Sequence, residues 1–197
     1  MGILPKGLQL LARVMFIAIW LSATLYGCAN QTREANELIK EYNAYINEYN
    51  NLDKHASALM RSVNTSAGSI EDFEENIEVL EEVEVKIDQQ LAELVEASKL
   101  LEKAQYLNID KTLKTYIEME QKANKASQEL TGTAKELASG LKDIYEAMNT
   151  RPGPDQTELE EKTEIINELN AELGTQKQKV EELKDKAKNY YREHDIG

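Results

Sequence analysis

The five residues "YLNID" (106–110) decide how many helices this chain forms. On both sides of them, apolar residues recur every three or four positions, which is the spacing of one face of a helix. The upstream pattern, continued past Leu101, predicts apolar residues at 105 and 108, but the downstream pattern starts at Ile109 and continues at Leu113. This shift of register has two interpretations: a turn with Asp110 capping a new helix, or one long helix with a skip residue.

Helix length favours the turn. With a turn there, the helices cover about 30–63, 70–106, 110–148 and 156–192, each ~50–60 Å long at ~1.5 Å per residue. Matching lengths suit an antiparallel bundle, whereas an unbroken helix from 70 to 148 would leave much of its apolar face uncovered. We therefore predict an all-α fold: an elongated antiparallel four-helix bundle with coiled-coil-like heptad packing.

Two further starts carry capping signals. Ser69 is followed by Asp72 three residues on, and Asp155 is followed by Glu158, which is the spacing of a capping box. An up-down-up-down bundle places the 106–110 turn and the C-terminus at one end and the loops at 64–69 and 149–156 at the other.

Each predicted helix has an apolar seam with a few polar positions. In the second helix the seam is Ile70, Phe73, Ile77, Leu80, Glu84, Ile87, Leu91, Leu94, Ser98 and Leu101. In the fourth it is Leu159, Lys162, Ile166, Leu169, Leu173, Gln176, Val180, Leu183, Ala187 and Tyr190. We expect Glu84 either to turn to solvent or to accept a hydrogen bond from Tyr49, and Glu120 of the third seam to turn outward or to fix the register. Tyr42, Tyr45 and Tyr49 are expected in the core, with their hydroxyl groups at its rim.

The only cysteine of the chain lies in "LYGC" (25–28), directly after its most apolar segment. Lys6 and Arg13 give that segment a positive start, and the apolar stretch at 14–26 is shorter than the ~20 residues that a membrane-spanning helix needs. We therefore interpret residues 1–27 as a cleaved export signal and 28–197 as a single helical domain. The alternatives are a plain signal peptide, or an uncleaved anchor helix that starts near Leu8.

The order Leu25, Tyr26, Gly27, Cys28 resembles the lipobox of bacterial lipoproteins, although Tyr26 stands where a small residue is usual. The resemblance implies that Leu25 and Gly27 are recognised by the signal peptidase and that the Cys28 thiol receives a diacylglycerol. It also implies a lipid-anchored protein on the extracytoplasmic face of the cell membrane. Apart from this covalent lipid, we expect no cofactor.

The net charge of the chain disfavours some classes of binding partner. The signal contains two of the 23 basic residues and none of the 36 acidic ones, so the mature chain would have a net charge of −15. Like-charge repulsion disfavours nucleic acid and anionic wall polymers as partners. A lone cysteine permits no intramolecular disulfide, and nothing resembles a metal-binding cluster of cysteine and histidine.

Groups suited to catalysis are sparse. His55 and His194 are the two histidines, and neither follows a glutamate by three residues, as a di-iron bundle requires. No phosphate-binding loop or nucleophile elbow is present. We predict that the protein is not an enzyme and has no catalytic or metal-binding residues. Glu193, His194 and Asp195 are expected to form a frayed terminus.

Three segments, "LKDIYEAM" (141–148), "INELNAEL" (166–173) and "KAKNYYREHDIG" (186–197), resemble the cell-wall-binding helical lipoproteins of Gram-positive bacteria. This resemblance implies a structural or interaction role at the cell envelope, with an envelope protein or a neutral glycan as the partner. The alternative is a chaperone-like or ligand-binding bundle that opens to bury an apolar guest. Arg151, in the loop between the last two helices, is the candidate partner contact, although an ordinary connector is the favoured interpretation of that loop.

Overall fold

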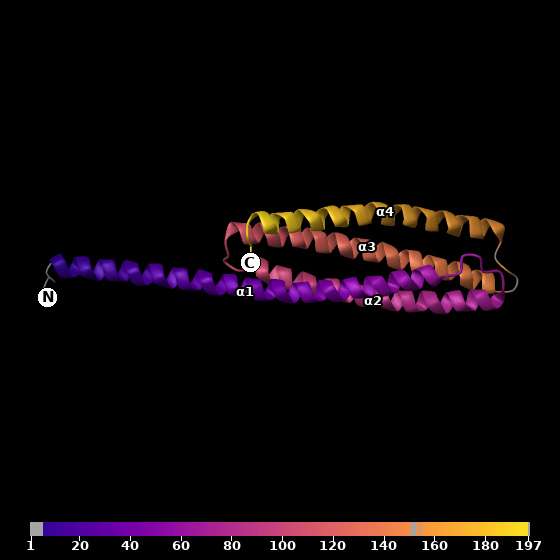
Figure 1. The fold of residues 1–197 in the computed structure, drawn as a ribbon, viewed down its shortest axis with the longest axis horizontal. Helices are drawn as coiled ribbons and strands as arrows, with labels where there is room; N and C mark the ends of the chain where they lie inside the picture. The colour runs from indigo at the N-terminus through magenta and orange to yellow at the C-terminus, as the bar shows by residue number, and fades with distance from the viewer. Residues whose placement is uncertain (1–5, 151–152, 154, 197) are drawn as a thin grey trace.

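The computed structural model describes the backbone of residues 6–150, 153 and 155–196, and within that range the side chains from residue 30 onward. Its helices are α1 (Lys6–Ser62), α2 (Ile70–Gln105), α3 (Lys111–Asn149) and α4 (Gln156–Glu193). The described residues form no strand, and consecutive helices pack antiparallel (Figure 1). The predicted all-α antiparallel bundle is confirmed. α1 begins well before the expected residue 30, and its N-terminal part projects beyond the other helices (Figure 1).

The segment at 106–110 is a turn. α2 ends at Gln105, and the Asp110 carboxylate caps α3 by accepting a hydrogen bond from the N–H of Leu113 at 2.9 Å. The N–H of Asn108 donates to Gln31 Oε1 of α1 at 2.6 Å, which holds the turn against the first helix. Residues 70–148 therefore form two helices, and not one helix with a skip residue.

The two predicted capping boxes have different outcomes. At the start of α2 the box is complete: the N–H of Asp72 donates to Ser69 Oγ at 3.2 Å, and the N–H of Ser69 donates to Asp72 Oδ2 at 3.1 Å. At the start of α4, Asp155 Oδ1 instead accepts from the N–H of Thr157 at 2.8 Å. The side chain of Glu158 approaches Lys162 at 3.9 Å and does not close a box.

The buried face of α2 differs from the predicted seam. One predicted column is confirmed, with Phe73, Leu80, Ile87, Leu94 and Leu101 buried at intervals of seven. The second buried column is Asn76, Val83, Gln90, Ala97 and Ala104, also at intervals of seven. The predicted second column is half-buried at 77, 84, 91 and 98, and Ile70 is exposed. Amide and alanine side chains give little hydrophobic signal, so the sequence pattern selected their larger neighbours.

The last helix joins the bundle through one neighbour. The ten predicted seam residues of α4 are all buried or half-buried, which confirms its seam, but only Ile166, Val180 and Ala187 are fully buried. α4 packs against α3, and among the described residues no Cα atom of α4 lies within 8 Å of a Cα atom of α1. The ring of four helices is therefore open between α1 and α4.

The core consists of two apolar clusters. The proximal cluster lies near the 106–110 turn and contains Ala35, Ile39, Tyr42, Ala97, Leu100, Leu101, Ala104, Ile109, Leu113, Tyr116, Ile117 and Ala187. The distal cluster contains Ala56, Phe73, Leu80, Val83, Ile87, Ala138 and Tyr145. Buried polar residues lie between the clusters along the bundle, among them Gln90, Asn124, Ser127 and Thr131.

Glu84 neither turns fully to solvent nor pairs with Tyr49, the two alternatives that the sequence suggested. Its carboxylate accepts a hydrogen bond from Lys142 Nζ of α3 at 2.6 Å, and 19% of each of the two side chains is exposed. This ion pair raises the pKa of Lys142. Tyr49 lies elsewhere, with its ring beneath Lys184 of α4 at 5.4 Å. Glu84 thus links α2 to α3 and not to α1.

Candidate functional site

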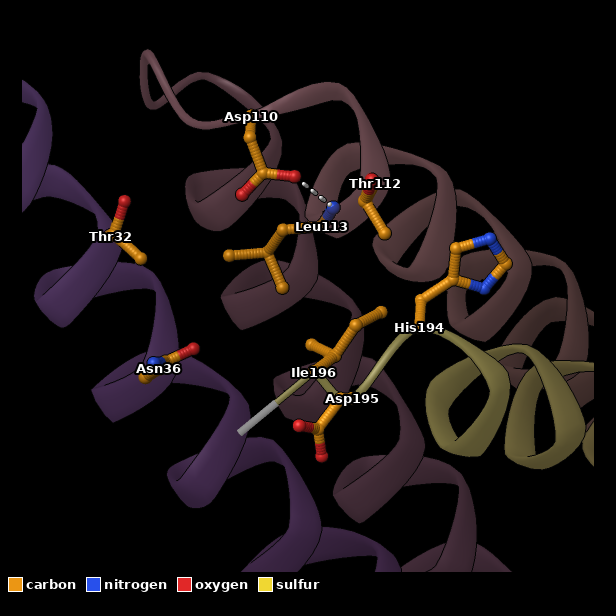
Figure 2. Close-up of a pocket in the computed structure, with 8 residues that line it drawn as sticks. All are labelled: Thr32, Asn36, Asp110, Thr112, Leu113, His194, Asp195 and Ile196. Atoms are coloured by element: carbon orange, nitrogen blue, oxygen red, sulfur yellow. Dashed lines mark hydrogen bonds between the residues drawn. The ribbon is translucent and has the colours of Figure 1, made fainter.

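Three chain segments meet at the end of the bundle that contains the 106–110 turn, which we call the proximal end. Figure 2 shows them around a hollow of about 290 Å³: Thr32 and Asn36 from α1, Asp110, Thr112 and Leu113 at the start of α3, and residues 194–196 after α4. Leu113 and Ile196 lie at the centre of this view. As predicted, the turn and the C-terminus share one end, and α1 emerges there (Figure 1).

Residues 194–196 fold back onto the bundle, whereas a frayed end was expected. The His194 ring stacks on Tyr190 with 4.0 Å between the ring centroids. Asp195 adopts a φ of 47°, and the N–H of Ile196 then donates to the Tyr191 carbonyl at 3.2 Å, which is the wide hydrogen bond of a Schellman motif. Ile196 packs against the proximal cluster. Across the described residues, no group of three or more His, Cys, Asp or Glu side chains could hold a metal ion.

The side chains of the predicted site residues are outside the part of the chain that the structure describes. Leu25, Gly27 and Cys28 belong to the backbone of α1, but their side chains are outside the described set. Arg151 is outside the described residues altogether. The acylation site and the distal partner contact therefore stay predictions.

A groove runs along the open side of the bundle between α1 and α4, and we call it the lateral groove. Its first part, the lysine hollow, has a volume of about 420 Å³, and its second, the inner hollow, of about 310 Å³. The lysine hollow is lined by Tyr49, Asn50, Asp53, Ser57, Leu130, Ala134, Leu173, Gly174, Lys177, Val180, Glu181 and Lys184. The inner hollow is lined by Asp53, Ala56, Ser57, Met60, Arg61, Val83, Ile87, Gln90, Ala134, Leu137 and Leu173. Both volumes fall in the ~300–1,000 Å³ range of small-molecule sites.

Lys184 is the half-buried charged residue of the lysine hollow. Its side chain is half-buried over the Tyr49 ring, and it forms no salt bridge with any described carboxylate. Burial lowers the pKa of Lys184, and the more distant charges of Asp53, Glu120 and Glu181 partly oppose that effect. The lysine is therefore a partly desolvated cation without a direct counter-ion.

Glu120 is half-buried, and of its two expected roles, turning outward or fixing the register, the first is not seen. Its Oε2 accepts a hydrogen bond from the Tyr42 hydroxyl at 2.8 Å, which links α3 to α1. Burial, together with the charge of Glu120, raises the pKa of Tyr42 and of Tyr116. The carboxylate is thus hydrogen-bonded to another side chain, and it acts on Lys184 only as a more distant charge.

The inner hollow borders an incompletely paired polar layer. Gln90 is 3% exposed, and its Nε2 has no hydrogen-bond partner. Nearby, Asn124 Nδ2 donates to the Leu94 carbonyl at 2.9 Å and to Ser98 Oγ at 2.8 Å, while its Oδ1 has no partner. A buried unpaired polar atom costs ~1–3 kcal/mol, so packing is weakest between the two apolar clusters.

Sequence reasoning did not find the lateral groove. Two features of the sequence could have indicated it. One is the buried column of α2 that contains Asn76 and Gln90, and the other is Gly174, which leaves a gap in the side chains of α4. Neither feature identifies a groove without knowing which helices are neighbours.

Comparison of the chain with known protein families, with curated proteins and with solved structures found no match. None of the described helix segments combines the length and apolarity needed to cross a bilayer.

Proposed function

We propose that the protein is a lipid-anchored lipoprotein of the cell envelope, a helical rod that stands on the extracytoplasmic face of the membrane. The observation that carries the proposal is the sequence "LYGC" (25–28) and its distance from the bundle. Ala35, the first buried residue described in α1, follows Cys28 by only seven positions. A lipid on Cys28 would therefore hold the proximal end of the bundle close to the bilayer.

The distribution of charge supports this orientation. Residues 30–36, 102–117 and 188–197, at or near the proximal end, contain six basic and five acidic side chains. Residues 59–81 and 140–164, toward the distal end, contain four basic and thirteen acidic ones. The net negative charge is thus concentrated away from the proximal end, so that end meets little repulsion from an anionic membrane surface.

In this proposal the partner is an envelope protein or a neutral glycan, as the resemblance to cell-wall-binding lipoproteins implies. The acidic distal end disfavours a negatively charged wall polymer. Arg151, in the distal loop between α3 and α4, stays the candidate contact.

The lateral groove favours a second candidate, a bundle that accommodates an apolar guest. Such a function requires an incompletely packed core, and the groove, the open α1–α4 side and the unpaired Gln90 amide provide one. The two candidates are compatible, because a rod fixed at one end can bind a guest along its side.

The anchor is tested by Cys28→Ala in cells that produce the full chain. We expect wild-type protein in the membrane fraction with incorporated fatty acid, and Cys28→Ala without this label, either uncleaved or released. Ser22→Ala, in the apolar stretch of the signal, is the matched control and should behave as wild type. Equal fatty-acid labelling of Cys28→Ala and wild type would refute the anchor.

A further inference from the structure

The lysine hollow and the inner hollow form one continuous groove, because Asp53, Ser57, Ala134 and Leu173 line both of them. On α1 the groove extends from Tyr49 to Arg61, which is ~18 Å at ~1.5 Å per residue. It is therefore long and narrow, and it lies parallel to the helices.

The inner part of the groove is mainly apolar. Its walls are formed by Ala56 and Met60 of α1, Val83 and Ile87 of α2, Ala134 and Leu137 of α3, and Leu173 of α4. Burial of an apolar group against such a surface contributes ~25 cal/mol per Å². An extended hydrocarbon chain fits the length of the whole groove and the lining of its inner part, which spans ~12 Å from Asp53 to Arg61 on α1.

The other part of the groove is lined by two lysines and two carboxylates, and one of these four charged residues is half-buried. Lys184 is half-buried there without a salt bridge, whereas the charged groups of Asp53, Lys177 and Glu181 are exposed at the rim, where water screens them. A neutral guest would leave Lys184 without a counter-ion, and a cationic guest would be repelled by it. An anionic head group at this position restores the missing pair.

We propose that the lateral groove binds one long-chain fatty acid, with its carboxylate at Lys184 Nζ and its hydrocarbon chain along the inner hollow. This inference rests on the second proposed function, the bundle that accommodates an apolar guest, and it specifies the class of that guest. The adjacent bilayer of the proposed location is the source of the fatty acid.

Gly174 offers a way to block the groove without disturbing the helix. A Cβ atom at this position would meet no heavy atom within 4 Å, so a leucine side chain enters open space that borders the lysine hollow. Gly132 of α3 is the matched control, because a Cβ there also meets nothing within 4 Å and the residue does not line either hollow.

A second pair of variants tests the charge. Lys184→Met removes the cation and keeps the length of the side chain. Lys179→Met is its control on the same helix, since Lys179 lies outside both hollows and pairs with Glu129 at 3.3 Å on the surface.

The experiment is photo-crosslinking in cells that produce the full chain and are supplied with a fatty acid carrying a diazirine and an alkyne. After irradiation the protein is purified and its adducts are mapped by peptide mass spectrometry. We expect light-dependent adducts within 49–61 of α1 and 173–184 of α4. Gly174→Leu and Lys184→Met should each lower their yield at sub-saturating probe by at least about tenfold, and the two controls should match wild type.

The proposal is overturned if no light-dependent adduct maps to these segments, or if Gly174→Leu and Lys184→Met leave the yield unchanged. Label on the peptide that contains Cys28 does not require light, so it reports separately on the anchor. Failure of the groove and failure of the anchor are thus distinguishable in one experiment.

Discussion

Asp195 holds the chain reversal that docks the C-terminus. Its φ of 47° lies in the left-handed region, which glycine adopts freely and which disfavours β-branched residues. We expect Asp195→Gly to melt at or above the wild-type temperature and Asp195→Val to lose ~1–2 kcal/mol of the free energy of unfolding. Thermal melts followed by circular dichroism measure both. Equal melting of the two variants would show that this conformation is not retained in solution.

The buried tyrosines predict how stability depends on pH. Burial raises the pKa of Tyr42, Tyr49 and Tyr116, so the folded state keeps these phenol protons at a pH where the unfolded state loses them. Stability is therefore full below pH ~10, the pKa of an unfolded tyrosine, and falls as pH rises above it.

This prediction is checked by urea unfolding at pH 9 and at higher pH, together with tyrosinate absorbance. Tyr42→Phe should reduce the slope of stability against pH, and Tyr106→Phe is the control because Tyr106 is 89% exposed. A slope unchanged by Tyr42→Phe contradicts the burial of its phenol.

At the scale of single residues, the sequence pattern predicted burial best for side chains with a clear preference for the core or for solvent. Tyr42 and Tyr49 were expected in the core and are 3% and 5% exposed, whereas Tyr45, expected there with them, is half-buried. Gln90, which is 3% exposed, was not predicted there, because a single polar residue is buried only when its neighbours allow it, and those neighbours come from other helices.

Two glycines of α3 differ in what lies beside them. A Cβ at Gly132 would meet nothing within 4 Å, whereas at Gly140 it would lie 2.8 Å from Ile166 Cδ1 of α4. Gly132→Ala should stabilise the protein by ~0.5–1 kcal/mol through helix propensity. Gly140→Ala should gain less or lose stability, because Ile166 must move.

Urea denaturation of both alanine variants provides the comparison. Equal gains for the two would indicate that α3 and α4 are not as close at Gly140 as the structure places them.

At the scale of the elements, the sequence predicted where the helices begin and end better than it predicted which helices lie next to each other. The turn at 106–110 follows from the change of register and from Asp110, both of which are local. The open side between α1 and α4 could not be predicted, since periodicity marks the apolar face of a helix and does not say which helix covers it.

For the whole molecule, we expect local opening to be easier in α4 than in α2, because of how α4 is attached to the bundle. Among the described residues, α4 has three buried side chains and α2 has eleven, and the backbone of α4 comes close to that of α3 but not to that of α1 or α2. Few buried contacts mean a small free energy of local opening. We expect hydrogen exchange to be at least about tenfold faster in the middle of α4 than in the middle of α2. Uniform protection of the two helices would contradict the open bundle.

The central claim, a lipid-anchored rod, is tested most directly by the mass of the N-terminal tryptic peptide of the protein purified from membranes. The account predicts a chain that begins at Cys28, with the peptide at 28–33 carrying the added mass of a diacylglycerol. A peptide that continues through Gly27 and ends in the same Arg33, with a free thiol at Cys28, would contradict it.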